Sequence, residues 1–193
     1  MTWKPKDPVR LTTRRFVIRS MTARDVTPTF LRWQNDRELR AGQNLHAPRV
    51  TREIALKTIK SADNARRFYL LICATIAETP IGFFGVNADH ADGFAETIVV
   101  IGDRHWWGKS VVTEARAALL DFLFDEVGMR KVLGKPHARN LASVFNYRVQ
   151  GFNCEGVLRE QLKSVADGTP LDQMVFGLLR DDWQASKEAA KND

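Results

Sequence analysis

The chain has 193 residues, of which 44% are hydrophobic and 27% charged, and these proportions predict a single globular domain with a core of its own. No apolar run approaches the ~18 residues of a membrane-spanning helix, so no membrane partner is expected. The net charge of +6 is dispersed and forms no long basic block, so direct binding to nucleic acid is not expected either.

Two features bear on the compartment. The first residues, Met1 to Lys6, contain no apolar core like that of a secretory signal. The chain has only two cysteines, Cys73 and Cys154, and each lies in an apolar or strand-like run. They predict buried free thiols rather than a disulfide, and therefore a cytoplasmic location.

Turn residues and apolar spacing predict strands and helices after a flexible arm at 1–10, where Pro5 and Pro8 disfavour regular structure. In chain order, the expected elements are a strand at 15–19, helices at 22–33 and 52–62, strands at 68–77, 81–87 and 94–101, a helix from 111 to the glycine at 128, a strand at 131–135, a helix from 140 to about 150, and strands at 152–162 and 170–179. This mixture predicts an α/β (or α+β) fold with helices on the faces of a sheet.

Local signals define several of these boundaries. Thr22 and Asp25 have the spacing of a capping box, and Pro28 either strains the helix that follows or delays its start. Asp167-Gly168 is typical of a two-residue hairpin between the last two strands.

The stretch from 96 to 126 organises the chain as strand, tight loop and helix. Its β-branched run up to Ile101 is typical of a buried strand, and Gly102 ends that run. Ser110 occupies the N-cap position of the next helix, where its hydroxyl is expected to accept a backbone N–H bond. Because a helix start presents unpaired N–H groups and Gly108 allows close backbone approach, the loop predicts an anion site. The alternative is a plain strand-to-helix turn.

A phosphate-binding P-loop is a second interpretation of the same residues, because Gly108-Lys109-Ser110 ends like one. That motif needs a glycine at position 103, which is Asp103 here, and two tryptophans fill the loop. The P-loop is therefore rejected.

A second group of residues, further along the chain, allows two interpretations. By residue type alone, Asn140 is a helix N-cap, Ser143 lies on the helix surface, Tyr147 packs, and Gly151 ends the helix.

The histidines show no paired ligand spacing, so no metal site is expected at any of them: His46, His90, His105 and His137.

Taken together, the two stretches resemble the GNAT N-acetyltransferase superfamily. The pyrophosphate loop of that family reads Gln/Arg-x-x-Gly-x-Gly/Ala, and His105, Gly108 and Ser110 fall on its defined positions, two of them with a different residue. The family's second pattern, Asn-x-x-Ser/Ala and then Tyr four residues before Gly-Phe, matches in register over 140–152. The wider run at 101–115 is similar to the ribosomal-protein N-acetyltransferase (RimJ/RimL-like) branch.

The resemblance implies a mixed, mostly antiparallel central sheet flanked by about four helices. It covers residues 11–183 as a single acetyltransferase domain, with a charged tail at 184–193. It further implies acetyl-CoA as co-substrate and acetyl transfer to a primary amine, with a protein or peptide N-terminal α-amine preferred. Amino sugars, nucleotide sugars and aminoglycosides are alternative acceptors, a non-catalytic CoA-binding module is the alternative to an enzyme, and the resemblance allows a homodimer.

The resemblance also implies roles for single residues. Glu96 is the expected general base, directly or through water, although a solvated glutamate at a strand end is the simpler interpretation. Tyr147 is the expected general acid, because a phenol can protonate a departing thiolate. The residues expected at the CoA site are Val99, Val100, Ile101, His105, Trp107, Gly108, Lys109, Ser110, Asn140, Ser143 and Tyr147.

Overall fold

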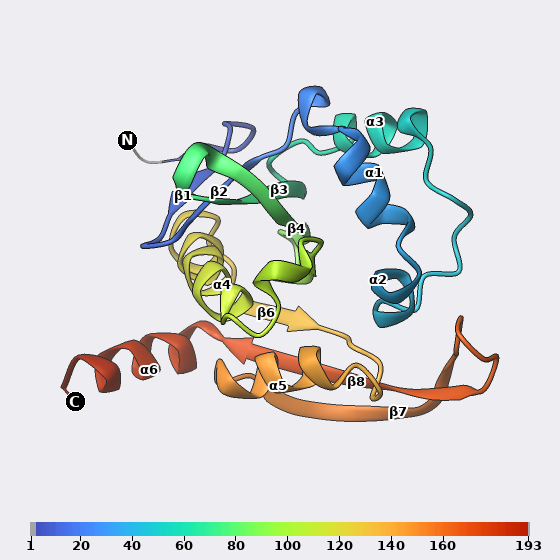
Figure 1. The fold of residues 1–193 in the computed structure, drawn as a ribbon. Helices are drawn as coiled ribbons and strands as arrows, with labels where there is room; N and C mark the ends of the chain where they lie inside the picture. The colour runs from blue at the N-terminus through green and yellow to red at the C-terminus, as the bar shows by residue number, and fades with distance from the viewer. Residues whose placement is uncertain (1–2, 193) are drawn as a thin grey trace.

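The computed structural model describes residues 3–192 and forms one eight-stranded sheet with helices on its faces (Figure 1). The strands are β1 (Arg10–Thr12), β2 (Phe16–Ser20), β3 (Arg67–Ala74), β4 (Thr79–Asp89), β5 (Phe94–Ile101), β6 (Lys131–Gly134), β7 (Asn153–Lys163) and β8 (Pro170–Leu179). The α-helices of the described residues are α1 (Pro28–Asn35), α2 (Arg37–Gly42), α3 (Arg52–Lys60), α4 (Val111–Asp121), α5 (Leu141–Val149) and α6 (Arg180–Asn192).

The sheet has the order β1-β2-β3-β4-β5-β6-β8-β7. Every neighbouring pair is antiparallel except β5 and β6, which run parallel. The expected mixed, mostly antiparallel sheet is therefore confirmed. The described residues contain six α-helices rather than about four, because α2 forms at 37–42, beyond the first predicted helix, and the C-terminal segment adds α6.

The core lies on both faces of the central strands. In β3, Leu70 and Ile72 belong to the apolar cluster beneath α4, while Leu71 and Cys73 belong to the cluster beneath α1 and α3. Side chains alternate between the two faces of a strand, so a strand covered on both faces must be apolar throughout. This explains why the run at 68–77 reads as a central strand in the sequence.

The first helix begins at the later of the two starts that the sequence allows. Thr22 and Asp25 do form a capping box, but the box begins only a short 3₁₀ turn at Ala23–Asp25. α1 begins at Pro28, with Thr27 as its N-cap. Proline is favourable at the first position of a helix, where its missing N–H would have no partner.

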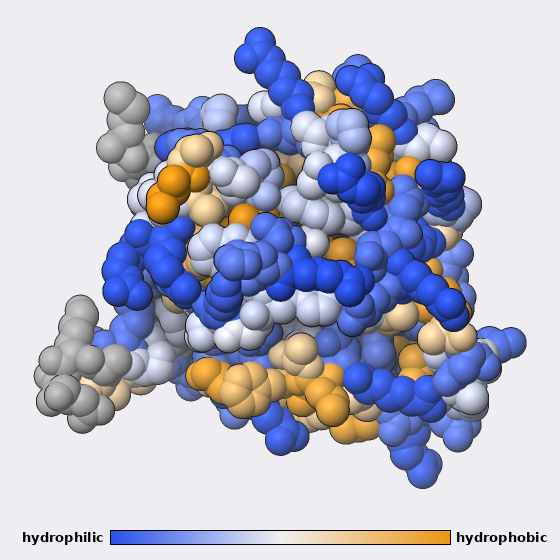
Figure 2. All heavy atoms as spheres, viewed as in Figure 1, coloured by the Kyte–Doolittle hydropathy of each residue, from blue (hydrophilic) through white to orange (hydrophobic). Residues whose placement is uncertain are grey.

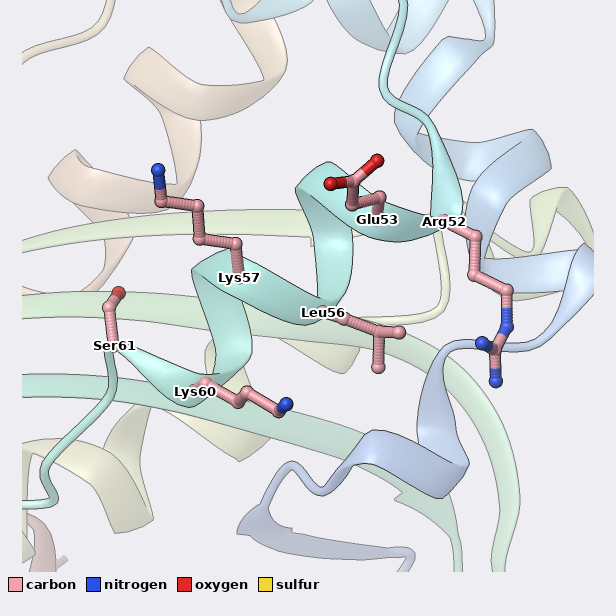
Figure 3. Close-up of a pocket in the computed structure, with 6 residues that line it drawn as sticks. All are labelled: Arg52, Glu53, Leu56, Lys57, Lys60 and Ser61. Carbon is pink, nitrogen blue, oxygen red and sulfur yellow. The ribbon is translucent and has the colours of Figure 1, made fainter.

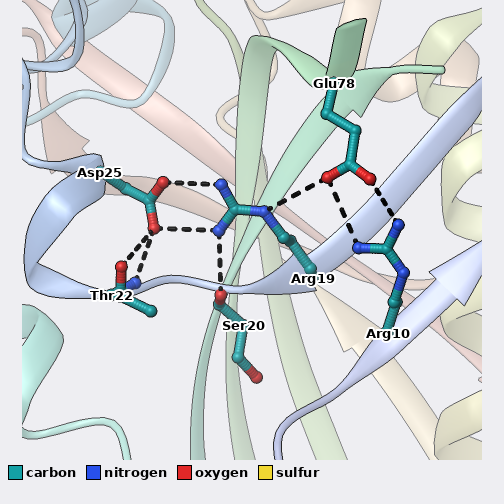
Figure 4. A network of polar contacts seen from close by, with 6 residues as sticks. All are labelled: Arg10, Arg19, Ser20, Thr22, Asp25 and Glu78. Carbon is teal, nitrogen blue, oxygen red and sulfur yellow. Dashed lines mark hydrogen bonds and ion pairs between the residues drawn. The ribbon is translucent and has the colours of Figure 1, made fainter. Parts of the chain in front are cut away.

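A network of polar side chains holds this turn to the edge of the sheet (Figure 4). Arg19 donates to Asp25 at 2.7 Å, and its guanidinium also lies 3.9 Å from Glu78, which pairs with Arg10. Burial of the Asp25 carboxyl opposes its charge, but hydrogen bonds from Arg19 and Thr22 outweigh that cost and hold the pKa of Asp25 below its ordinary value.

Residues 3–10 pack against the domain, whereas the sequence predicts a loose arm at 1–10, whose first two residues lie outside the described structure. The ring of Trp3 meets that of Phe122 edge-on, with centroids 5.1 Å apart, and Val9 is only 2% exposed. β1 begins at Arg10, so the arm leads directly into the sheet. The sequence analysis did not identify Trp3 and Val9 as buried contacts, because charged residues and prolines surround them in the sequence.

The turn between β7 and β8 is wider than the predicted two-residue hairpin. Lys163 pairs with Pro170, so the connection spans residues 164–169. Within it, the Asp167 carboxylate accepts both the N–H and the hydroxyl of Thr169. A side chain that bonds its neighbours in this way stabilises a longer turn.

Both cysteines are free thiols, as expected, but only one is buried. Cys73 lies in the core, and burial raises the pKa of its thiol to about 11. Cys154 is exposed because it lies on β7, the edge strand of the sheet. The prediction that both thiols are buried is therefore wrong for Cys154.

One face of α5 is apolar and faces solvent, and apolar residues gather along this side of the molecule in Figure 2. Leu141, Phe145 and Val149 follow one another at helical spacing and are all more than half exposed.

Within residues 3–192, no helix has the length and apolar character needed to cross a bilayer.

The two parallel strands separate part of the way along. β5 pairs with β6 only from Phe94 to Glu96, opposite Lys131 to Leu133. β6 ends at Gly134, whereas β5 continues to Ile101. The second half of β5 therefore has no strand beside it on this side, and the sheet opens there into a gap.

Candidate active site

The open edge of β5 carries backbone groups that face the gap. The carbonyl of Thr97 accepts the Tyr147 hydroxyl at 3.3 Å, and the carbonyl of Ile101 accepts the Trp107 indole N–H at 2.8 Å. Because backbone groups alternate along a strand, the N–H and C=O of Val99, midway between them, point the same way. Such an edge can pair with an extended ligand that contains amides.

The loop after β5 is held by its own side chains. The Asp103 carboxylate accepts the His105 N–H at 3.0 Å, and Trp106 packs edge-on against Phe16 at 5.3 Å. Lys109 Nζ lies 2.9 Å from His105 Nε2. His105 and Lys109 therefore contact each other, and Trp106 is a packing group, whereas the Trp107 side chain is exposed.

Ser110 does not cap α4 in the way that was predicted. It precedes the helix, but its φ is 55°, in the left-handed region, and its side chain makes no cap hydrogen bond. A capping side chain requires an extended backbone at that position. Gly108 is also left-handed, with φ of 71°, and a Cβ there would meet no atom within 4 Å.

The missing cap leaves a set of backbone donors open at the loop. Across the described residues, no hydrogen bond uses the N–H groups of Gly108, Ser110, Val111, Val112 or Thr113. Helix donors in the first turn have no partner within the helix, and the dipole adds positive potential there. Gly108, Ser110 and the first turn of α4 therefore present open donors at the place where the sequence predicts an anion site, and the binding of an anion there stays a prediction. The N–H groups of Trp107 and Lys109 are already bonded within the loop.

A carboxylate that the sequence analysis did not single out holds this helix start in place. Glu114, in the first turn of α4, accepts the Thr13 hydroxyl at 2.7 Å and the Arg15 N–H and Nε at 2.9 and 2.6 Å. Burial opposes its charge, but these bonds outweigh that cost and lower the pKa of Glu114. Arg15 also donates to the Lys109 carbonyl at 3.0 Å.

Tyr147, on α5, is 3% exposed and reaches the gap from the face of the sheet that α4 covers. Its ring stacks on Phe176 with centroids 5.3 Å apart. Its hydroxyl lies against Gly134, where a Cβ would overlap it. Packing thus fixes the ring, as expected from residue type, while the hydroxyl still reaches the β5 edge.

Glu96 lies on the opposite face of the sheet from Tyr147. It shares its face of β5 with Val100, which belongs to the cluster beneath α1 and α3. Its carboxylate is 34% exposed and pairs with Lys135 Nζ at 2.9 Å. Glu96 and Tyr147 therefore flank Thr97 from two sides of the same gap.

Asn140 and Ser143 lie at the start of α5. Asn140 Oδ1 accepts the Ser143 N–H at 3.1 Å, and its Nδ2 donates to the Gly42 carbonyl at 2.6 Å. The predicted cap is confirmed, and the amide also ties α5 to α2. Among the described residues, the Ser143 hydroxyl makes no hydrogen bond.

Two hollows lie on the α1–α3 side of the molecule. A narrow one, next to the gap, is lined by Trp33, Gln34, Leu39, Arg40, Gln43, Leu45, Phe83 and Val100. Arg40 is the charged residue of this lining, and it donates to the carbonyls of Gln34, Leu45 and Ala47. The narrow hollow thus has one cation and no carboxylate.

The second hollow lies on the outer side of α3 (Figure 3). Arg52, Lys57 and Lys60 extend from the helix in different directions, with Leu56 between them (Figure 3). Side chains that spread in this way make an open basic surface and do not converge on one ligand. The gap between β5 and β6 remains the candidate active site.

Comparisons with known proteins identify the family to which the chain belongs. The family model for the acetyltransferase (GNAT) domain matches residues 15–153, which include the loop, Glu96 and Tyr147. The chain is 31% identical over 120 residues to the uncharacterized N-acetyltransferase p20 of Bacillus licheniformis, and the match spans 62% of this chain and 65% of that protein.

Solved structures share the fold. The ribosomal-protein-S5-alanine acetyltransferase of Vibrio fischeri aligns with a TM-score of 0.77 and 17% identity, over 91% of this chain and 98% of that one. The spermidine N-acetyltransferase of Vibrio cholerae, solved with CoA and spermine, aligns with a TM-score of 0.79 and 18% identity, over 89% and 99% of the two chains. The family model covers most of the chain and the fold agrees, so this protein belongs to the GNAT family of acetyltransferases, and the expected acyltransferase is confirmed at that level.

Proposed function

We propose that the protein is an acetyl-CoA-dependent N-acetyltransferase that moves an acetyl group to a primary amine, with residues 11–183 as its single catalytic domain. One observation carries the proposal. The gap between β5 and β6 lies between a set of open backbone donors at the start of α4 and the Tyr147 hydroxyl. A ligand that carries an anion and a thioester on one extended arm would place the anion at the open donors and the thioester at the Tyr147 hydroxyl.

The residues present fit acetyl-CoA. The free N–H groups of Gly108, Ser110 and the first turn of α4 would hold the pyrophosphate, and Lys109 adds positive charge beside them. The backbone of Val99 would pair with the amides of the pantetheine arm. When bound, acetyl-CoA supplies the acetyl thioester.

The reaction requires two proton transfers. A lysine amine, with a pKa of ~10.4, is neutral about once in 2,000 molecules at pH 7, whereas an α-amine, with a pKa of ~7.8, is neutral in about one of seven. Glu96 would accept the proton that the amine loses, directly or through water. Tyr147 would give its hydroxyl proton to the sulfur that leaves the acetyl group.

A protein or peptide α-amine is the acceptor that we prefer, in line with the ribosomal-protein N-acetyltransferase branch. An α-amine is neutral far more often than a lysine-type amine at pH 7, so it makes a smaller demand on the proposed base. An amino sugar or nucleotide sugar is the second candidate.

Binding and turnover test the proposal separately. Calorimetry with acetyl-CoA, with CoA and ATP as controls, should give micromolar binding of acetyl-CoA and none of ATP. An amine panel of peptides, amino sugars and polyamines should then release free CoA above background hydrolysis. Binding without any release would indicate a non-catalytic CoA-binding module, and no binding would overturn the proposal.

A further inference from the structure

One arginine lies in the core with no acidic partner. Arg116, on α4, is 1% exposed, and its Nη1 donates to Gln150 Oε1 at 3.0 Å. Its Nε has no hydrogen-bond partner, and none of the ion pairs among the described side chains includes it. Burial lowers the pKa of Arg116, but a guanidinium starts so high that it keeps its charge.

The guanidinium lies over the ring of Tyr147. Its Cζ is 4.3 Å from the centroid of that ring and 6.0 Å from the centroid of Phe152. Phe176 stacks on Tyr147 with an interplanar angle of 11°. The ring that carries the candidate general acid is therefore packed against a cation and an aromatic side chain.

The other groups that contact Tyr147 are uncharged. They are Thr97 on β5, Gly134 on β6, Phe152 ahead of β7 and Phe176 on β8. The next charges along β5 and β6 are the Glu96–Lys135 pair, which lies on the other face of the sheet. Arg116 thus supplies the charge that faces the tyrosine.

If Arg116 served only to fill space in the core, its buried charge would lower the stability of the fold without any gain. A buried charge without a counter-charge reduces stability, and replacing such groups with apolar residues of similar volume is often neutral or stabilising. Apart from the Gln150 amide, the groups around the guanidinium are the rings of Tyr147 and Phe152, beside which an apolar side chain of similar volume would also pack. Features that cost stability in this way are expected where function requires them.

We propose that Arg116 is a positioning residue for Tyr147. It holds the ring so that the hydroxyl reaches the gap, and its charge stabilises the phenolate left when that hydroxyl gives up its proton. In the step concerned, the amine nitrogen forms a bond to the acetyl carbon, the C–S bond breaks, and the sulfur takes the Tyr147 proton. The phenolate regains a proton from water, and the proton released by the amine leaves through Glu96. The catalytic part rests on the proposed function.

The first test compares stability with turnover. Arg116→Met should lower kcat about tenfold and leave the KM for acetyl-CoA unchanged. Gln150→Leu is the matched control, because it breaks the same hydrogen bond and keeps the charge, and its kcat should stay within about twofold. The melting temperature of Arg116→Met should fall no further than that of Gln150→Leu, since each variant leaves one buried group without its hydrogen-bond partner. Arg116→Lys should recover part of the turnover. A larger fall of melting temperature together with the loss of kcat, without recovery by lysine, would mean a structural role alone.

The second test does not depend on turnover. The chain has two tyrosines, so in a Tyr69→Phe background ¹³C-labelled tyrosine reports the ring of Tyr147 alone. The guanidinium carbon of Arg116 lies 4.3 Å from the centroid of that ring, so removing the guanidinium changes both the packing and the field at the ring. Arg116→Met, or Arg116→Gln if methionine does not fold, should therefore shift the ring ¹³C resonances of Tyr147, whereas Gln150→Leu should leave them in place, with far-UV circular dichroism confirming that each variant stays folded.

The two proposals fail in different ways. Unchanged ring resonances overturn the role of Arg116, whether or not the protein transfers acetyl groups. Shifted ring resonances in a protein that transfers no acetyl group count against the proposed function alone. In an active protein, Arg116→Met should add no further loss to Tyr147→Phe, and equal losses in both backgrounds would again overturn the role.

Discussion

Replacing Ser110 with alanine tests whether the start of α4 is built for capping or for binding. A hydroxyl that caps a helix contributes about 1 kcal/mol, and truncation removes that contribution. Ser110 has the position of a cap, but its φ of 55° is left-handed and its side chain makes no cap bond. We therefore expect Ser110→Ala to change the free energy of unfolding by less than about 0.5 kcal/mol.

Ser110→Gly tests the backbone at the same position. A left-handed conformation costs a residue with a Cβ roughly 1–2 kcal/mol, which glycine avoids. Glycine also adds freedom to the unfolded chain, worth about 0.4–1 kcal/mol in the opposite sense. The net expectation is no loss of stability, or a gain of up to about 1 kcal/mol. Acetyl-CoA should bind equally well or more tightly, because no side chain then crowds the open N–H groups.

Urea unfolding measures both variants against a matched control. Thr51 is a genuine cap, since its hydroxyl accepts the Ile54 N–H at 3.3 Å at the start of α3. Thr51→Ala should lower the free energy of unfolding by about 1 kcal/mol with an unchanged m-value. A loss of that size for Ser110→Ala would refute the reasoning, because it would show that the hydroxyl caps α4 after all.

Three further variants or conditions probe the gap and its supports. Tyr147→Phe should lower turnover and leave acetyl-CoA affinity by calorimetry unchanged, and equal turnover would remove Tyr147 from the mechanism. Gly134→Ala should reduce both stability and turnover, because its Cβ overlaps the Tyr147 hydroxyl, while Gly156→Ala, whose Cβ meets no atom within 4 Å, should change turnover little. The pKa values of Asp25 and Glu114 are lowered in the fold, so their stabilisation is present above the ordinary carboxyl range and is lost as pH falls below about 4. Acid unfolding should therefore show a smaller loss of stability in Glu114→Gln than in the parent protein, and an identical loss would show that Glu114 makes no such contribution.

The elements that the sequence predicted well are those with strong local signals. The strand at 94–101 has the predicted bounds, because a β-branched run ends at Gly102 and the chain cannot continue straight past it. Residue type alone was less informative at Ser110. A serine before a helix predicts a cap only if its backbone is extended, and the loop between β5 and α4 instead turns left-handed there.

The candidate site depends on pairing between segments that lie far apart in the chain. Local sequence patterns do not predict such pairing. The gap exists because β6 ends at Gly134, two residues before Pro136, while β5 continues to Ile101. Arg116 did carry a signal, since it is a charged residue within the buried stripe of α4. The contact with Tyr147, across 31 positions of sequence, appears only when α4 and α5 pack together.

The sheet separates the two residues that we propose for proton transfer. Glu96 lies on the face beneath α1 and α3, and Tyr147 lies on the face beneath α4 and α5, yet both flank Thr97 at the same gap. In the proposed mechanism, an acetyl thioester held along β5 would present its carbonyl to an amine from one face and its sulfur to a phenol from the other. The acceptor side and the donor side of the site would then be formed by different helices. On this proposal, substitutions in α1 and α2 are expected to change which amine binds, while α4 and α5 keep the same contacts with acetyl-CoA.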